Sequence, residues 1–126
     1  MFKFALFVLL VAVSTTSTAA QARVGDLFNF IPSLGACGFT NTSQQIVASV
    51  PSAVFSSYPG AGTNPNKNPI CHHSVQIESG QTTLTAPIVD FYTAATDSNV
   101  GLSAAGFVKF ADLDDGVVRN VSWVVV

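Results

Sequence analysis

The chain has 126 residues, of which 48% are hydrophobic and only 10% are charged, and its formal net charge is −2. This length favours a single domain, and the hydrophobic fraction excludes an intrinsically disordered chain, which lacks the residues to form a core. With only 5 Lys and Arg residues, the chain also lacks the clustered basic side chains that nucleic-acid binding requires.

The first 22 residues have the pattern of a secretory signal peptide. Lys3 gives a positive start, residues 4–13 form an unbroken apolar run, and Ala20-Gln21-Ala22 is an A-x-A cleavage site. The run is shorter than the about 20 apolar residues that a membrane-spanning helix needs, and the alternative is a buried N-terminal helix. We expect cleavage after Ala22, a secreted extracellular domain over residues 23–126, and no membrane association.

Strand signals dominate the rest of the chain. A short β-rich run at residues 45–50 ends at a proline. Residues 74–78 (SVQIE) alternate polar and apolar side chains, as a half-buried strand does, and Ser79-Gly80 supplies a turn before the β-branched run 81–89. These two runs predict a β-hairpin. Residues 117–126 predict either a final pair of strands or one long bent strand.

Two other segments separate these strands. Residues 56–69 are predicted to be a loop, because prolines and glycines interrupt a stretch rich in Asn and Ser. Residues 103–113 predict one short helix: Ser103 can cap its start, its aromatic residues fall on one face, and Gly116 lies just past its end. The pattern predicts a small, mainly β domain, and many short strands around one core favour a barrel.

Covalent modifications are predicted for cysteines and asparagines. Cys37 and Cys71 are an even pair in a secreted chain, which favours one disulfide, closing a loop of about 35 residues, over two free thiols. The Asn-x-Ser/Thr sequons at Asn41 and Asn120 are candidate glycosylation sites, although so short a pattern also arises by chance.

Short segments of the chain follow one another in a recognisable order: 34–38 (LGACG), 66–71 (NKNPIC), 88–90 (IVD), 101–107 (GLSAAGF) and 121–123 (VSW). This order resembles the small secreted fungal proteins with a rare lipoprotein A-like double-psi β-barrel, relatives of barwin and of the first domain of expansins. The resemblance implies a six-stranded double-psi β-barrel with one or two short helices, a groove across one face, and pairing of the two cysteines. We also expect a monomer.

The chain departs from the family pattern in this groove. Asp90 matches the first groove acid, but Phe91-Tyr92 replaces the Arg-Cys that follows it in the family, and no later cysteine is present. Gly101 stands where the family has a second acid. Glycoside hydrolysis normally uses two carboxylates, so this departure favours a protein that is not an enzyme. Asp90 stays a candidate catalytic residue, because some relatives cleave glycans with a single essential Asp.

The resemblance implies that a groove around Asp90 binds cell-wall polysaccharide, as expansin-like relatives do without hydrolysis. Phe91 and Tyr92 can stack on sugar rings, and His72 is a further candidate for the groove. The opposing interpretation places Phe91 in the core and lets Tyr92 pack where the missing cysteine would stand.

Two other functions are open. The chain is alternatively a protein-binding module, either a cysteine-protease inhibitor or a secreted effector, because some relatives of this barrel bind a protease. The exposed polar loop at residues 64–69 is then the candidate contact. A third function is a glycan-cleaving enzyme that uses Asp90 alone.

Neither a cofactor nor a metal ion is expected. His72 and His73 are adjacent, so on a strand they point to opposite faces, and no Cys-x-x-Cys or His-x-x-x-His spacing accompanies them. Residues 112–116 (DLDDG) lack both the alternating acids and the later Glu of a calcium-binding EF-hand loop. We expect them to form an acidic turn after the helix.

Overall fold

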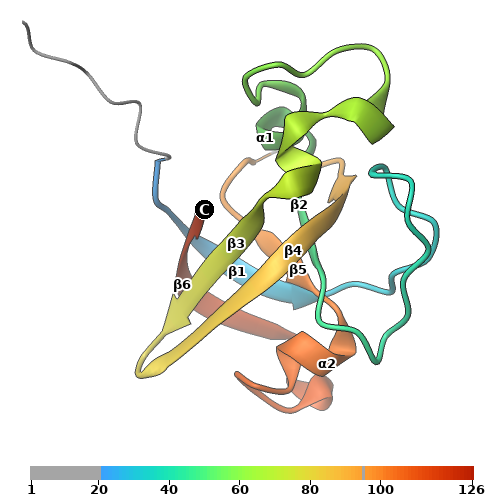
Figure 1. Ribbon diagram of the computed structural model, residues 1–126. Coiled ribbons are helices and arrows are strands. Elements are labelled where there is room, and N and C mark those ends of the chain that lie inside the picture. Colours follow the sequence, from blue (N-terminus) through green and yellow to red (C-terminus); the bar gives the residue numbers. More distant parts are fainter. Residues whose placement is uncertain (1–20, 95) are drawn as a thin grey trace, which may run out of the picture.

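The computed structural model describes residues 21–94 and 96–126 (Figure 1). The predicted signal peptide lies outside this part of the chain, apart from Gln21 and Ala22. Six strands form a closed barrel in the order β1-β5-β2-β4-β3-β6, and two short α-helices lie outside it (Figure 1). The mainly β, six-stranded double-psi barrel expected from the sequence is therefore confirmed.

The regular elements are short, and most of them follow the sequence signals. The strands are β1 (Arg23–Asn29), β2 (Ala48–Pro51), β3 (Ser74–Ser79), β4 (Thr82–Tyr92), β5 (Val100–Leu102) and β6 (Val117–Val125). The helices are α1 (Ser52–Ser56) and α2 (Ala104–Phe107), with 3-10 helices η1 (Pro65–Lys67), η2 (Pro69–His72) and η3 (Leu113–Asp115). The pairs β1–β5 and β2–β4 are parallel, and the other neighbouring strands are antiparallel.

The predicted hairpin is confirmed as β3 and β4. Its turn lies one residue later than expected, because Ser79 already pairs with Thr82, which leaves Gly80 and its successor as the loop. Gly80 has φ 58°, a conformation that favours glycine. β6 is one long strand that pairs with both β1 and β3. It bends near Asn120, which has φ 58° and lies where the register with β1 shifts, as in a β-bulge.

The helix expected over residues 103–113 is shorter than predicted. α2 ends at Phe107, because Gly106 is a poor helix former and the Phe107 ring is drawn into the core, and turns and the 3-10 helix η3 follow it. Ser103 does not cap the helix with its side chain. Its buried hydroxyl donates to the Gln45 carbonyl and accepts from the Val47 N–H at 3.1 Å, which ties α2 to the chain entering β2. β2 itself begins at Ala48, so the predicted run of residues 45–50 was placed too early.

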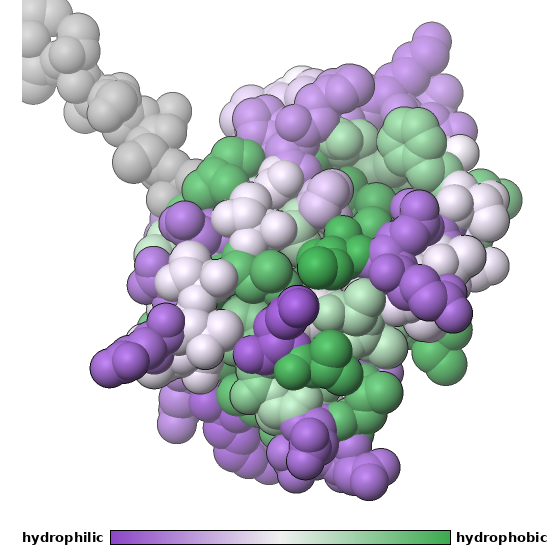
Figure 2. Space-filling model, turned by 60° about the horizontal axis from the view of Figure 1, so that its bottom comes forward, coloured by the Kyte–Doolittle hydropathy of each residue, from purple (hydrophilic) through white to green (hydrophobic). Residues whose placement is uncertain are grey.

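The interior of the barrel is filled by apolar side chains from the strands, α1, α2 and η2. The largest fully buried ones are Trp123, Phe107, Leu27, Ile70, Ile77, Ile88 and Leu102. The Trp123 indole donates to the Ser98 carbonyl at 2.7 Å, so its one polar atom is satisfied. On the face drawn in Figure 2, hydrophobic residues form separate patches between hydrophilic ones. Within the described part of the chain, no helix has the length and apolar character needed to cross a membrane.

Candidate functional site

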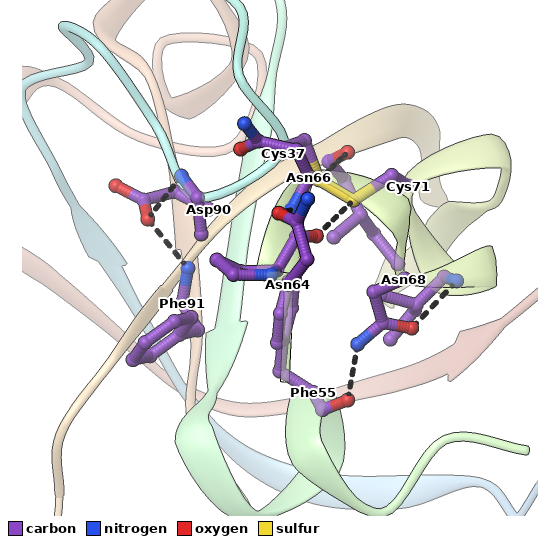
Figure 3. The surroundings of a disulfide bond; sticks show 12 residues. Cys37, Phe55, Asn64, Asn66, Asn68, Cys71, Asp90 and Phe91 are labelled. Atoms are coloured by element: carbon purple, nitrogen blue, oxygen red, sulfur yellow. Dashed lines mark hydrogen bonds between the residues drawn. A yellow bond between two sulfur atoms is a disulfide. The ribbon is translucent and has the colours of Figure 1, made fainter. Parts of the chain in front are cut away.

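Two long connections come near the end of β4, one along the right of the barrel and one over its top in Figure 1. The first loop, residues 30–47, joins β1 to β2, and the second loop, residues 57–73, joins α1 to β3. A disulfide between Cys37 and Cys71 links them, with the two Cα atoms 5.6 Å apart (Figure 3). The predicted pairing of the cysteines is confirmed, and it joins two loops rather than two strands.

The first loop contains a tight turn at residues 34–40 that is fixed to the barrel. Within the turn, the Gly35 N–H donates to the Phe39 carbonyl at 3.0 Å. The Cys37 N–H donates to the Val89 carbonyl of β4 at 3.1 Å. A Cβ atom on Gly35 would lie 2.4 Å from the same Val89 oxygen, so only glycine permits this close approach. The turn is therefore held against β4 by its backbone.

Asparagine side chains order the second loop. The Asn64 Oδ1 accepts from the Asn66 N–H, and the Asn68 Oδ1 accepts from the Ile70 N–H, both at 3.1 Å. Each capping asparagine is followed by a proline, whose fixed φ suits the first position of a helical turn. Asn68 is buried, and its Nδ2 donates to the Phe55 carbonyl at 2.7 Å (Figure 3). Residues 57–63 of the predicted loop are irregular as expected, while residues 64–72 form two consecutive capped turns.

Asp90 lies in β4 beside the first loop. Its Oδ1 accepts from the Phe91 N–H at 2.9 Å and from the Ala36 N–H at 3.1 Å (Figure 3). Ala36 belongs to the turn at residues 34–40, so the carboxylate helps to hold this turn on the barrel. One carboxylate oxygen of Asp90, the candidate groove acid, therefore has a structural role.

Phe91 lies at the surface rather than in the core. Its side chain is 37% exposed, and its ring packs on Phe55 with the ring centroids 4.9 Å apart. The two rings line an open cavity of about 290 Å³, with Ser56, Ala61, Gly62, Thr63, Pro65 and Asn68 completing its walls. In Figure 3 the Phe91 ring points away from the Asp90 carboxylate, and Asp90 does not line the cavity.

Tyr92 is half-buried and points toward the opposite side of β4 from Phe91, as alternation along a strand requires. Its ring packs edge-on against Phe28 at 4.8 Å, and its hydroxyl donates to the Asn99 carbonyl. Burial, and then the negative charge of Asp97, raise the pKa of Tyr92 from 10.0 to about 12. Both the ring and the hydroxyl of Tyr92 are therefore engaged within the protein.

The raised pKa of Tyr92 gives a pH-dependent stability. Between about pH 10 and pH 12 the Tyr92 hydroxyl loses its proton in the unfolded chain and keeps it in the folded chain. The contribution of Tyr92 to the free energy of unfolding is therefore complete below pH 10 and is lost as the pH rises through this range. We expect the difference in unfolding free energy between wild type and Tyr92→Phe to shrink from about pH 9 to about pH 11. Urea denaturation at both pH values measures it, and a constant difference would contradict the assignment.

The remaining sequence candidates lie apart from these contacts. His72 ends η2 and is exposed, and its imidazole forms no hydrogen bond with any described residue. Gly101 is buried in β5, and a Cβ there would lie 2.9 Å from Phe28 Cζ and 3.3 Å from Phe30 Cδ1. Aromatic rings thus fill the place of the second groove acid. Over residues 21–94 and 96–126 no three metal-ligating side chains come together.

The two sequons differ in their surroundings. Asn120 is exposed at the bend of β6. Asn41 is half-buried, its Nδ2 donates to Gln45 Oε1 at 3.3 Å, and its Oδ1 is buried without a partner among the described residues. Glycosylation at both positions remains a prediction.

Several residues that shape this region gave no signal in the sequence analysis. Phe28 comes from β1, which was not predicted, Phe30 follows directly after that strand, and Phe55 comes from α1. Asn68 was named only as part of a polar loop, although the repeated Asn-Pro pairs at 64–65 and 68–69 are typical of capped turns.

The chain is similar to proteins of known sequence and structure over most of its length. A papain inhibitor from Streptomyces mobaraensis is 33% identical over 91 residues, which are 71% of this chain and 60% of that protein. This chain therefore spans less than two thirds of the length of that relative. The solved structure of a Streptomyces papain inhibitor has a TM-score of 0.76 and 28% identity, covering 86% of this chain and 97% of the other.

Two structures of an expansin from Clavibacter michiganensis are also similar. The complex with cellohexaose has a TM-score of 0.64 and 17% identity, and the apo form has 0.65 and 15%; each covers 84% of this chain and 50% of the expansin. The chain shares their fold. No sequence model of a known family matches it. Neither organism is a fungus, so these relatives do not support the fungal origin that the sequence resemblance implied.

Proposed function

We propose that the protein acts outside the cell as a monomeric inhibitor of a papain-type cysteine protease. The observation that carries this proposal is the similarity to a papain inhibitor, which extends over nearly the whole of that protein's solved structure at 28% identity. The expansins are 17% and 15% identical, and they support the fold alone. The proposal gives Asp90 a structural role at the turn and needs no catalysis by this chain.

The geometry of the second loop suits such a role. Residues 64–67 are exposed, while Asn68 beneath them is buried and bonded to α1 and η2. Capped turns, two prolines and the disulfide fix this loop before any partner arrives. A loop that is already ordered loses little conformational freedom on binding, which favours affinity. Loop 64–69 is accordingly the proposed contact with the protease.

Inhibition of papain by the purified protein tests the proposal. We expect a stable complex and an inhibition constant that rises about tenfold in Lys67→Ala, because this exposed lysine lies at the tip of the proposed contact. Lys109→Ala is the matched control, since Lys109 is exposed beyond α2, and its inhibition constant is expected to stay unchanged. A wild-type protein that neither inhibits papain-type proteases nor forms a complex with one would contradict the proposal.

Binding of cell-wall polysaccharide is a second candidate function. The observation in its favour is the open cavity lined by Phe55 and by Phe91, the residue that follows Asp90 in β4. The engaged hydroxyl of Tyr92 and the filled space at Gly101 weigh against a groove like that of a glycan-cleaving enzyme. Incubation with insoluble cellulose, chitin and peptidoglycan separates the two functions. Retention that Phe91→Ala abolishes, without protease inhibition, would favour polysaccharide.

A further inference from the structure

The turn at residues 34–40 carries two large apolar side chains in solvent. Leu34 is 70% exposed and Phe39 is 57% exposed. The turn that presents them is fixed by its hydrogen bonds to β4, by the Asp90 carboxylate and by the disulfide. Large apolar side chains held in water on a rigid turn mark an interaction surface rather than a loosely packed region.

This turn lies directly against the proposed inhibitory loop. A Cβ on Gly38 would stand 3.1 Å from the Asn66 side chain, so the backbone of the first loop touches the second loop. One residue away, Cys37 of the turn is joined by the disulfide to Cys71, which follows loop 64–69 in η2. The turn and loop 64–69 therefore form one surface, which we call the two-loop surface.

Most of the two-loop surface is free of charge. Residues 27–66 contain no Asp, Glu, Lys, Arg or His, and this stretch includes the whole first loop and the second loop up to Asn66. The ionisable side chain that the surface presents is Lys67, at its margin. An uncharged apolar surface is complementary to a partner region that is itself uncharged and apolar, because neither side has to bury an unpaired charge.

We infer that Leu34 and Phe39 insert into an uncharged apolar part of the substrate cleft of the same cysteine protease, while loop 64–69 contacts its margin. This inference rests on the proposed function and adds to it the residues that select the protease. The two side chains are expected to be the main anchors of the complex, since buried apolar and aromatic anchors dominate interface energies. The preferred partner is thus a protease whose cleft accepts Leu or Phe side chains of peptides.

Substitutions on the turn test the inference. We expect Leu34→Ala and Phe39→Ala each to raise the inhibition constant at least tenfold, and Phe39→Asp at least a hundredfold, because the last places a carboxylate in a dehydrated contact. Val108→Ala and Val108→Asp are matched controls, since Val108 is 51% exposed beyond α2, and they are expected to leave inhibition unchanged. Thermal unfolding of every variant should match wild type, because all these side chains are exposed.

The outcomes separate the inference from the function on which it rests. If wild type inhibits and Phe39→Asp inhibits equally well, the inference is overturned and the proposed function stands. If wild type inhibits no papain-type protease, the proposed function fails first. Analytical ultracentrifugation and polysaccharide pull-downs test whether a second copy of the chain or a polysaccharide binds to the two-loop surface instead. Self-association, or retention on a glycan, that Phe39→Asp abolishes would assign the surface to a second copy or to sugar, and would overturn the inference.

Discussion

Replacing both Cys37 and Cys71 by serine is expected to lower the free energy of unfolding by about 3–4 kcal/mol. The disulfide closes a segment with a sequence separation of 34 residues, and removing it restores the conformational freedom of this segment in the unfolded chain. Urea denaturation at equilibrium measures the loss. Wild type in the presence of a thiol reductant is the control and should show the same loss. A change below about 1 kcal/mol would show that the crosslink contributes little.

The same double substitution is expected to weaken protease inhibition without unfolding the barrel. The disulfide joins the two loops and Cys37 is itself buried in the core, but the six strands keep their pairing partners without it, so far-UV circular dichroism should be unchanged where the variant is folded. The turn at residues 34–40 keeps its hydrogen bonds to β4, but the second loop loses its covalent link to it. Equal inhibition by wild type and the folded variant would mean that the two loops need no crosslink to act together.

Introducing the missing groove acid, Gly101→Asp, is expected to destabilise the protein by about 3–5 kcal/mol. The new Cβ would stand 2.9 Å from the Phe28 ring, and the carboxylate would be buried beside aromatic rings. Gly62→Asp is the matched control, because Gly62 is exposed and a Cβ there meets nothing within 4 Å. It should change stability by less than about 0.5 kcal/mol in the same urea titration.

A milder variant keeps this prediction testable if Gly101→Asp does not fold. Gly101→Ala adds only a methyl group and should cost about 1–3 kcal/mol through overpacking against Phe28. We also expect no release of reducing ends from wall glycans by Gly101→Asp, because the new carboxylate has no open space in which to meet a substrate. Wild-type stability of either variant would show that the rings of Phe28 and Phe30 move aside easily.

The sequence predicted the parts of the fold that depend on local pattern. The alternation at residues 74–78 identified β3, and the ordered segments from residue 34 onward indicated the barrel. β5 has three residues, which are too few to show a period. The predicted helix was too long because the pattern did not reveal that Phe107 packs into the core, where the helix ends. The pattern also did not reveal that the Ser103 hydroxyl is used by the Gln45 carbonyl and the Val47 N–H. Tertiary contacts of this kind override a local capping signal.

The site was less predictable because it depends on contacts between distant segments. Cys37, Cys71 and Asp90 were identified from the sequence, and the structure places all three near the two loops. The engagement of Tyr92 depends on Phe28 and Asn99, which lie in β1 and just before β5. No pattern within the strand around Asp90 carries that information. Whether Asp90, Phe91, Tyr92 or His72 binds a ligand stays a prediction.

The closed order of the barrel has a consequence for an encounter with a proteolytic enzyme. Each of the six strands has a neighbour on both sides, so the described sheet offers no free edge to which an extended chain could add. The exposed residues 65–67 of the second loop form a capped helical turn, and a second capped turn follows directly. A protease that docks on the two-loop surface therefore meets a disulfide-linked turn and capped helical turns rather than a free strand edge. Resistance of this protein to cleavage would then come from the closed barrel and its crosslinked loops rather than from the sequence of any one segment.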